Sequence, residues 1–414
     1  MGAAPTTRDP GSSGFRSTQG IRRTTSEIMK LERLRLRDFR NYHDLDLTLG
    51  ASWIILTGAN AQGKTNLLEA IAVSCAGSSP RRAADIEMIR WGEESARVTA
   101  WLSSDVRGTL ELEATLAAGG RQIKVNGAER RLGDLIGLVG LVLFTVDDLD
   151  VVKRDPSARR RFLDVELGAL SRSYYWTLVR YRRVVEQRNR LLKAIRDGSR
   201  HSAELESWDE QLARFAGVIV EKRAAFLNAI AAHGDQAYRR LTGKAEALEL
   251  RYRPALGDEQ AWARLCSAAA DPEDLRLRIG ERVARALTEG RAKELELGMT
   301  LAGPHRDDFD IIGGAVDLHR FGSQGEQRTA AIAMRLGLVH VSAGTIGEPP
   351  LLLLDDVLSE LDAERRAGLF EGLGAAGQTI VTTTDMDAVP PGVRAAARNL
   401  RVINGLATPI PSGA

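Results

Sequence analysis

The chain has 414 residues, of which 43% are hydrophobic and 27% charged, a composition typical of a soluble globular protein. Its formal net charge of +2 does not indicate any class of partner, so a DNA-binding surface would have to be a local concentration of arginine and lysine. No apolar run approaches the roughly 18 residues needed to cross a bilayer, so we predict no membrane span. Cys75 and Cys266 stand singly, which argues against a disulfide framework or a zinc site and fits a cytoplasmic location.

The length predicts more than one structural unit, because single hydrophobic cores stop growing near roughly 250–300 residues. Residues 1–28 are rich in Gly, Ser, Thr and Arg and have no apolar segment, and we interpret them as a disordered extension. Residues 29–150 alternate short apolar runs with turns and one helix. This pattern indicates the β-rich first part of an α/β domain.

A glycine-rich stretch, GANAQGKT at 58–65, lies between an apolar run at 53–56 that suits a buried strand and a segment with apolar residues at helical spacing. In this context a Gly-x-x-x-x-Gly-Lys-Ser/Thr motif, the Walker A motif, binds nucleotide phosphates, and we predict an ATP site. Lys64 would supply catalytic positive charge, and Thr65 a hydroxyl for Mg²⁺. The predicted nucleotide contacts are Gly58, Ala59, Asn60, Ala61, Gln62, Gly63, Lys64 and Thr65. The alternative is a chance glycine-rich turn before a helix.

Residues 151–298 are almost wholly helical in pattern, and we interpret them as a helical lobe inserted into the α/β domain. The segment has no sustained heptads and no CxxC, which argues against long coiled-coil arms or a zinc hook.

The candidate DNA contacts lie in the densest basic stretches of this lobe. Phosphate contacts by such residues would be independent of sequence and weakened by salt. A solvated face balanced by nearby acids is the alternative. The predicted contacts are Arg159, Arg160, Arg161, Arg180, Arg182 and Arg183, with Arg188, Arg190 and Lys193 beyond them. If the lobe binds DNA, four aromatic residues near these arginines would stack on exposed bases, but their spacing favours packing between helices. They are Tyr174, Tyr175, Trp176 and Tyr181.

The sequence FGSQGEQR at 321–328 precedes an apolar helical pattern and predicts a second anion site. Ser323 suits an N-cap, and Gly325 allows the backbone to approach a ligand at the positive end of the helix dipole. ABC-type ATPases place such a signature turn over the γ-phosphate bound by a partner subunit, which makes ATP an adhesive between two copies. The predicted contacts are Ser323, Gln324, Gly325 and Gln327. An ordinary capped helix is the alternative.

The sequence PPLLLLDD at 349–356 suits a strand that is buried on both faces and ends in two carboxylates. At the carboxyl edge of a parallel sheet, Asp355 would assist Mg²⁺ and Asp356 would orient or deprotonate the attacking water, as in a Walker B motif. A solvated acidic turn is the alternative. Ser359 to Asp362 follow at the position of the ABC D-loop, which also meets the partner subunit. Further on, QTIVTTTD offers Thr384 and Asp385 where transporter ATPases carry a histidine, and the sequence does not decide whether either one senses the γ-phosphate.

Together these motifs resemble the RecF family of bacterial recombinational repair, which is related to the SMC ATPases. The resemblance rests on LRLRDFRNY at 34–42, GANAQGKTNLLEAI, FTVDDLDVVKRDPSARRRFLD at 144–164, LAGPHRDDFDI at 301–311, GSQGEQRTAAIAMRL and LLLLDDVLSELD. It extends from about residue 29 almost to the C-terminus. Val146 stands where the family usually has proline, and no Q-loop glutamine is evident. His305 and Arg306 match the family pattern, although we expect a lone histidine there to be structural.

The resemblance implies an ABC-type P-loop ATPase head, split into 29–150 and 299–414 around the inserted lobe 151–298. It implies that Arg40, with Tyr42, lies near the adenine. It further implies an ATP-dependent homodimer on single- and double-stranded DNA and gapped junctions, slow DNA-stimulated hydrolysis that acts as a timing switch, and a link to the SOS response. RecR, RecO and RecA are the partners that it implies, with RecA loaded at single-strand gaps.

Three other functions are weighed against this one. A membrane-importer ATPase subunit would carry a histidine after QTIVTTT, which the sequence lacks. A phosphotransferase would leave FGSQGEQR and SELD unexplained. A clamp that binds ATP but barely hydrolyses it follows if an aspartate at 356 reaches less far than the glutamate usual in ABC ATPases.

Overall fold

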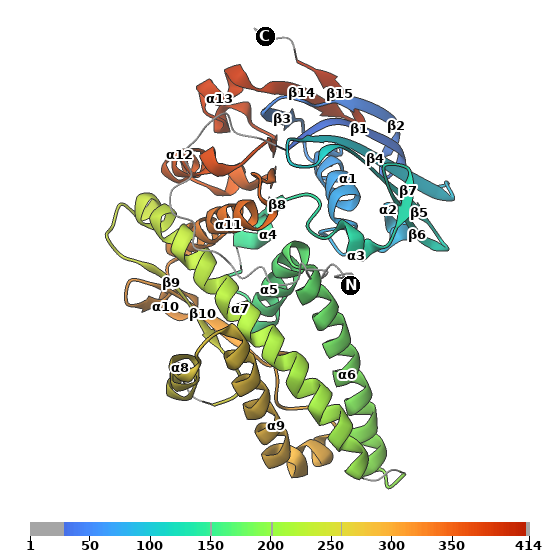
Figure 1. Ribbon diagram of the computed structural model, residues 1–414. Helices are drawn as coiled ribbons and strands as arrows, with labels where there is room; N and C mark the ends of the chain where they lie inside the picture. Colours follow the sequence, from blue (N-terminus) through green and yellow to red (C-terminus); the bar gives the residue numbers. More distant parts are fainter. Residues whose placement is uncertain (1–28, 150, 200–201, 258, 411–414) are drawn as a thin grey trace, which may run out of the picture.

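A computed structural model describes residues 29–149, 151–199, 202–257 and 259–410. The predicted disordered extension, residues 1–28, lies outside the described residues. Figure 1 shows a head with two large sheets at one end of the molecule and a bundle of long helices at the other.

The centre of the head is a six-stranded sheet with strand order β15-β14-β3-β13-β12-β8. Its strands are parallel except for the edge strand β15, which runs antiparallel to β14. The apolar runs predicted to be strands at 53–56 and 351–354 are separated in this sheet by β13 alone. Because all three strands are parallel, their carboxyl ends lie at the same edge of the sheet. The strands are β3 Trp53–Thr57, β8 Leu141–Thr145, β12 Leu351–Asp355, β13 Thr379–Thr383, β14 Arg398–Ile403 and β15 Leu406–Pro409.

Alternate residues of the central strands enter two different cores, because successive side chains of a strand point to opposite faces. Leu353 and Ile380 join the core that contains α1 (Lys64–Ala76) and the second large sheet. Leu354 and Val381 join the core that contains α11 (Gln324–Ile346) and the helical lobe. The central sheet is therefore covered on both faces, which explains its continuous apolar strands.

The second large sheet is antiparallel and has the order β2-β1-β4-β5-β6-β7. It packs over α1 and, with two short helices, forms the β-rich part that the sequence predicts. Its strands are β1 Lys30–Phe39, β2 Tyr42–Thr48, β4 Ser95–Ser104, β5 Gly108–Ala117, β6 Gly120–Val125 and β7 Ala128–Arg130, and the short helices are α2 Asp85–Met88 and α3 Leu132–Leu135.

The long helices α6, α7 and α9 form the bundle at the lower end of Figure 1. One strand, β9, interrupts the helical pattern that the sequence predicts for 151–298, because LELRYR alternates apolar and polar residues with the period of a strand. It pairs with β10, which follows the lobe in the chain. The elements of the lobe and of the segments on either side of it in the chain are α4 Val146–Leu149, α5 Pro156–Leu170, α6 Arg172–Arg196, η1 Ser202–Glu204, α7 Leu205–Thr242, β9 Leu248–Arg253, α8 Glu259–Ala268, α9 Pro272–Leu297, β10 Asp308–Gly313, β11 Val316–Asp317 and α10 Leu318–Phe321.

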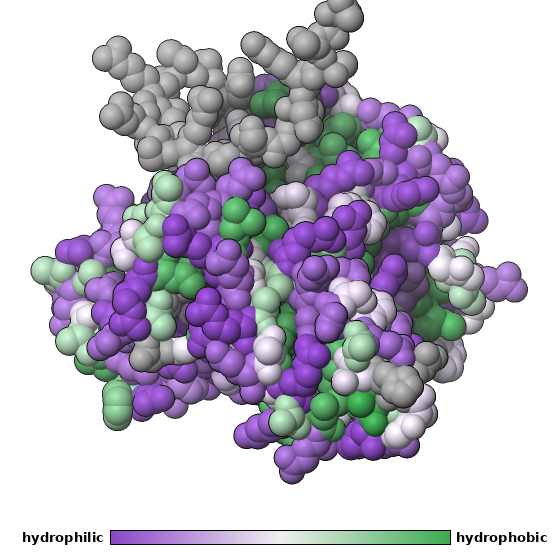
Figure 2. Space-filling view, turned by 60° about the horizontal axis from the view of Figure 1, so that its bottom comes forward, coloured by the Kyte–Doolittle hydropathy of each residue, from purple (hydrophilic) through white to green (hydrophobic). Residues whose placement is uncertain are grey.

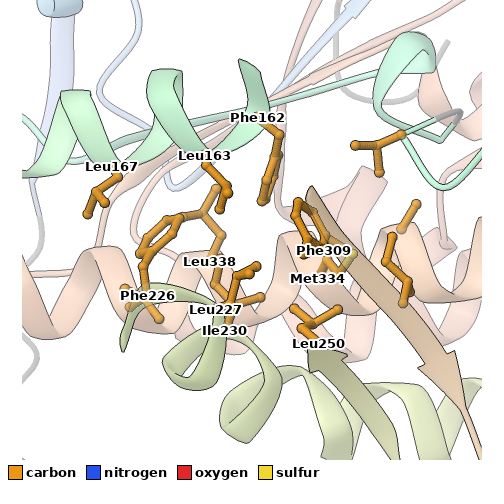
Figure 3. Close-up of a cluster of buried hydrophobic side chains, with 14 of the residues drawn as sticks. Phe162, Leu163, Leu167, Phe226, Leu227, Ile230, Leu250, Phe309, Met334 and Leu338 are labelled. Atoms are coloured by element: carbon orange, nitrogen blue, oxygen red, sulfur yellow. The ribbon is translucent and has the colours of Figure 1, made fainter. Parts of the chain in front are cut away.

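The lobe and the head share one hydrophobic core. Figure 3 shows side chains of α5 and α7 meeting those of α11, β9 and β10. The labelled residues are Phe162, Leu163, Leu167, Phe226, Leu227, Ile230, Leu250, Phe309, Met334 and Leu338. The remaining elements lie in the head after α11: η2 Val357–Glu360, α12 Ala363–Gly372, η3 Leu373–Ala375, η4 Met386–Ala388 and α13 Pro391–Ala396.

Within the described ranges, α11 alone is long and apolar enough to span a bilayer, but 78% of its most apolar window is buried inside the molecule. A helix that is apolar on all sides is expected where it is packed on all sides. The surface seen in Figure 2 is mainly hydrophilic, with scattered hydrophobic residues.

Candidate nucleotide-binding site

The predicted phosphate loop connects β3 to α1, as the sequence indicates. Gly58 and Gly63 have φ values of 156° and 115°. A Cβ atom on Gly58 would lie 2.3 Å from the carbonyl oxygen of Val402, and one on Gly63 would lie 2.6 Å from Nδ2 of Asn41. Only glycine fits at either position, so the curled path of the loop depends on both.

Lys64 begins α1 and folds back over the loop. Its Nζ donates to the carbonyl oxygens of Gly58 at 2.7 Å and Ala59 at 3.0 Å. Burial lowers the pKa of Lys64, while the charges of Asp356 and Asp355 oppose that shift. The ammonium group thus lies against the phosphate loop and within the electrostatic influence of the acidic pair, a position suited to a nucleotide phosphate.

Three segments that are distant in the sequence converge on Asp355 at the end of β12. The hydroxyl of Thr65 and the hydroxyl of Thr382 each donate to Oδ1 of Asp355 at 2.9 Å. A hydroxyl and a carboxylate are the hard oxygen ligands that Mg²⁺ prefers. The arrangement fits the predicted roles of Thr65 and Asp355.

Asp356 has the left-handed backbone conformation, with φ of 54°, and its N–H donates to the hydroxyl of Thr382 at 2.9 Å. Its Oδ1 is buried and has no hydrogen-bond partner within the described part of the chain. Burial raises the pKa of Asp356; Lys64 opposes this shift, and Asp355 and Glu360 add to it. A carboxylate oxygen without a partner beside the predicted Mg²⁺ ligands is suited to accept a proton from water.

Thr384 and Asp385, for which the sequence does not decide a role at the γ-phosphate, are exposed, and Thr382 is the threonine that contacts the acidic pair. Thr382 stands directly opposite Asp355 in the parallel register of β12 and β13. The signal that identifies it is strand register, which three consecutive threonines do not reveal by themselves.

The turn between β1 and β2 supports the phosphate loop from one side. Nδ2 of Asn41 donates to the carbonyl of Gln62, and the hydroxyl of Tyr42 donates to the carbonyl of Gly63, both at 3.0 Å. Arg40, predicted to lie near the adenine, is paired with Glu69 of α1 at 2.8 Å. Its guanidinium is therefore fixed against α1, and its contact with the base stays a prediction.

The signature turn leads into α11 as predicted, with Ser323 at the N-cap. Its side chain and that of Glu326 form a capping box, with 2.8 Å between the hydroxyl and the carboxylate. Gln324 is exposed, and a Cβ on Gly325 would lie 2.6 Å from Nη2 of Arg365. Gln327 is buried and donates to the carbonyl of Leu318 at 2.7 Å. This partner contradicts the prediction that Gln327 contacts a nucleotide, because its amide is used inside the fold.

The phosphate loop and the signature turn lie apart in one chain. Within the described ranges no hydrogen bond joins residues 58–65 to residues 321–328, and Figure 1 shows α10, which precedes the turn, well away from α1. The predicted D-loop segment contacts the signature helix, since Arg328 donates to Glu360 at 2.8 Å, and within that segment Ser359 donates to the carbonyl of Asp356 at 2.7 Å.

The candidate DNA contacts divide by exposure. Arg159 is 4% exposed and bound to Asp308 at 2.7 Å, and Arg188 is fully buried between Asp209 and Glu294. Both predictions are wrong for the same reason: each guanidinium neutralises buried carboxylates and is not accessible to a phosphate.

The other candidate arginines reach the surface to different extents. Arg160 and Arg161 are half-buried and donate to the carbonyls of Asp307 and Pro80, and Arg182 is paired with Asp164. Arg180 and Arg183 are exposed. Tyr174 and Tyr181 are buried, as the packing interpretation requires.

His305 of the GPHRDD motif belongs to a buried polar network. Its Nδ1 accepts from the hydroxyl of Tyr181 at 2.5 Å, and its Nε2 donates to the carbonyl of Thr300 at 3.1 Å. Asp307 accepts the N–H of Ala255 at 2.7 Å and the hydroxyl of Tyr252. The motif therefore joins β9 and β10 to α6, a structural role.

Comparison with known proteins places this geometry in a family. The model of the RecF/RecN/SMC N terminal domain matches residues 30–402. The DNA replication and repair protein RecF of Halalkalibacterium halodurans is 37% identical over 363 residues, which cover 87% of this chain and 94% of that protein. RecF of Staphylococcus aureus is 37% identical over 379 residues, which cover 91% of this chain and 99% of that protein.

Solved structures agree with this assignment. A structure of the recombination mediator protein RecF with ATP, in the RecFOR pathway, is 28% identical and has a TM-score of 0.82 over 94% of this chain and 100% of that one. An Smc head bound to the C-terminal winged-helix domain of ScpA is 15% identical with a TM-score of 0.51 over 92% of this chain and 96% of that one, which shows a shared fold. The fold is that of an ABC-type ATPase head, and the chain belongs to the RecF family.

Proposed function

We propose that the chain is a cytoplasmic, ATP-dependent DNA-binding protein of recombinational repair and replication restart. Two copies would sandwich two ATP molecules, with the phosphate loop of each facing the signature turn of the other. Hydrolysis would be slow and stimulated by DNA, and it would release the dimer, so that ATP times the residence on DNA.

One observation carries the proposal: the predicted phosphate and Mg²⁺ ligands and a separate capped signature turn lie on one chain, and within the described ranges no hydrogen bond joins residues 58–65 to residues 321–328. Thr65 and Thr382 both donate to Asp355, and Lys64 donates to two carbonyl oxygens of the phosphate loop. Ser323 and its helix N-terminus lie elsewhere in the same chain. A helix N-terminus attracts anions, and a second copy would bring this one to the γ-phosphate.

The residues of the site suggest how the reaction proceeds. The loop N–H groups and Lys64 would hold the phosphates, and Thr65 and Asp355 would hold Mg²⁺, which neutralises charge on the phosphate oxygens. Asp356 would orient a water and accept its proton as the water oxygen attacks the γ-phosphorus, the bond from this phosphorus to the bridging oxygen breaks and ADP leaves. Its raised pKa makes it a better proton acceptor than an ordinary aspartate.

The proposed partners follow from the family. The exposed arginines of the lobe would bind single- and double-stranded DNA and gapped junctions. The protein would also be linked to the SOS response. RecR and RecO would cooperate in loading RecA at single-strand gaps. The RecFOR context of the related ATP-bound structure supports this part of the proposal.

Light scattering with Mg-ATP and duplex DNA tests the proposal. We expect ATP to produce a dimer of the wild type, Lys64→Met and Ser323→Arg to abolish the dimer, and Asp356→Asn to prolong it. Ser323→Arg should still bind ATP as a monomer, because its own phosphate loop is intact. A protein that stays monomeric and hydrolyses ATP regardless of DNA would instead support a phosphotransferase. A dimer with equal turnover in the wild type and Asp356→Asn would support a clamp that barely hydrolyses ATP.

A further inference from the structure

A buried ionic triad links the nucleotide site, the signature helix and the first helix of the lobe. Arg335 of α11 is 6% exposed and binds Glu166 of α5 at 2.5 Å and Asp148 of α4. Its guanidinium also lies 5.1 Å from the ring centre of Phe162. Figure 3 shows Phe162 beside Phe309 in the core shared by head and lobe, so the triad borders this core.

The first arm of the triad reaches the acidic strand. Asp148 accepts the N–H of Thr145 at 2.8 Å and its hydroxyl at 2.9 Å. Thr145 ends β8 and stands directly opposite Asp355 in the parallel pairing of β8 with β12. A displacement of Asp355 by nucleotide and metal would therefore be transmitted to Asp148 through two neighbouring strand ends.

The second arm reaches the lobe. Glu166 lies on α5, the helix that also carries the candidate DNA contacts Arg160 and Arg161. Arg335 itself is twelve residues after the N-cap Ser323, about 18 Å along the helix axis. Arg335 thus joins the signature helix α11 to α5 through Glu166 and to the end of β8 through Asp148.

The chemistry of the triad suits positioning better than stability. A single guanidinium neutralises two carboxylates with little water around them, and such buried ion networks seldom add stability over apolar replacements. Their directional hydrogen bonds do fix the relative placement of the elements that carry them. Arginine is required because its planar fork reaches both acids at once, which a lysine ammonium does not.

We propose that Arg335 is a positioning residue that couples the ATP site to the DNA-contacting helices through Asp148 and Glu166. The inference rests on the ATP-dependent DNA binding proposed above. With ATP bound, the end of β8 would hold Arg335, and Arg335 would hold α5 in the orientation that binds DNA. Thermodynamic linkage requires the same factor in reverse, so that DNA strengthens ATP binding equally.

The test measures coupling rather than either affinity. The full chain is titrated onto a fluorescein-labelled duplex with and without Mg-ATPγS, and the ratio of the two dissociation constants is the coupling factor. Couplings of this kind are typically about 5–150-fold. The variant is Glu166→Gln, which keeps a carbonyl oxygen for Arg335 and removes the charge. Its matched control is Glu348→Gln, since Glu348 is also buried and bound by an arginine, Arg107 at 3.0 Å, but lies in the head outside the triad.

We expect Glu166→Gln to reduce the coupling factor by about fivefold or more, while nucleotide-free DNA affinity and ATP affinity stay within about threefold of wild type. Arg335→Lys should give the same loss, and it provides a second reading that preserves charge. Full coupling in folded Glu166→Gln and Arg335→Lys would overturn the inference and leave the proposed function standing. So would an equal loss in Glu348→Gln. A wild type whose DNA affinity ignores ATPγS would overturn the proposed function, and the inference with it.

Discussion

Burial favours the neutral form of two residues, His305 of the GPHRDD motif and Asp356 of the candidate nucleotide site. It lowers the pKa of His305 to about 4 and raises that of Asp356 above its ordinary value. For His305 the neutral form is also the one that the hydrogen bonds require, because Nδ1 must accept from Tyr181 while Nε2 donates. Protonation of His305 affects the stability of the fold, whereas protonation of Asp356 affects ATP hydrolysis.

His305 should make the fold sensitive to acid. Its folded-state pKa lies below the unfolded value of 6.5, so the unfolded chain binds more protons between those values. Stability from this residue is complete above pH 6.5 and is lost as the pH falls toward 4, with a loss of about 2 kcal/mol at pH 5. Urea unfolding of wild type and His305→Gln at pH 7 and pH 5 measures this contribution. Equal losses of stability in both proteins would show that His305 is not responsible.

Asp356→Asn should separate ATP binding from hydrolysis. Asparagine tolerates the left-handed backbone at φ of 54°, so the loop is expected to keep its shape. Loss of a proton acceptor typically lowers the rate by about 10²–10⁴-fold. Phosphate release and ATP affinity are measured together. Asp387→Asn is the control, because Asp387 is exposed and paired with Arg394. Unchanged turnover in Asp356→Asn would exclude its role as the base.

At the scale of elements, the β14–β15 hairpin and the β1–β2 turn together hold the phosphate loop at Gln62. The N–H of Asn404 donates to Oε1 of Gln62 at 2.8 Å, and the N–H of Gly405 donates to the carbonyl of Gln62 at 3.2 Å. Gly405 has φ of 77°, and a Cβ there would lie 2.5 Å from the carbonyl oxygen of Asn41. Two turns from opposite ends of the chain therefore meet at the loop.

Gly405→Ala should weaken ATP binding without unfolding the head. The substitution strains a left-handed residue by roughly 1–2 kcal/mol and pushes the hairpin from Asn41, which predicts about 5–30-fold weaker binding. Gly392→Ala is the matched control, since a Cβ there meets nothing within 4 Å. Titration with a fluorescent ATP analogue measures both. Equal ATP affinity in the two variants would mean that the hairpin does not shape the site.

At the scale of the whole molecule, the lobe is built onto the head and does not form a core of its own. The core of α5, α7 and α11 is continuous, so a change in the head can reach the helices of the lobe that carry the candidate DNA contacts.

Arg180 and Arg183 of α6 are exposed and, in the described part of the chain, make no ion pair, unlike Arg182. They are the candidates whose charge is most available to DNA.

Arg180→Ala/Arg183→Ala should weaken DNA binding about equally for different sequences. Each lost phosphate contact should reduce the slope of log K against log salt by about 0.9 on duplex DNA, so the double variant should lose about 1.8. Arg264→Ala/Arg285→Ala, which removes two exposed arginines from α8 and α9, is the control. A salt slope that is unchanged in the α6 variant, or reduced as much in the control, would place the DNA surface elsewhere.

The sequence by itself determined the features whose chemistry depends on contiguous residues. The phosphate loop, the acidic strand and the capped signature turn were all predicted, because glycine conformation, capping and strand burial are set within a few residues. Tertiary structure decided what distant segments do to one another. It buried Arg159 against Asp308, gave Gln327 an internal partner and brought Thr382 to Asp355. Exposure and long-range pairing arise only when segments pack, and no local pattern encodes which residue will then lie within hydrogen-bonding distance.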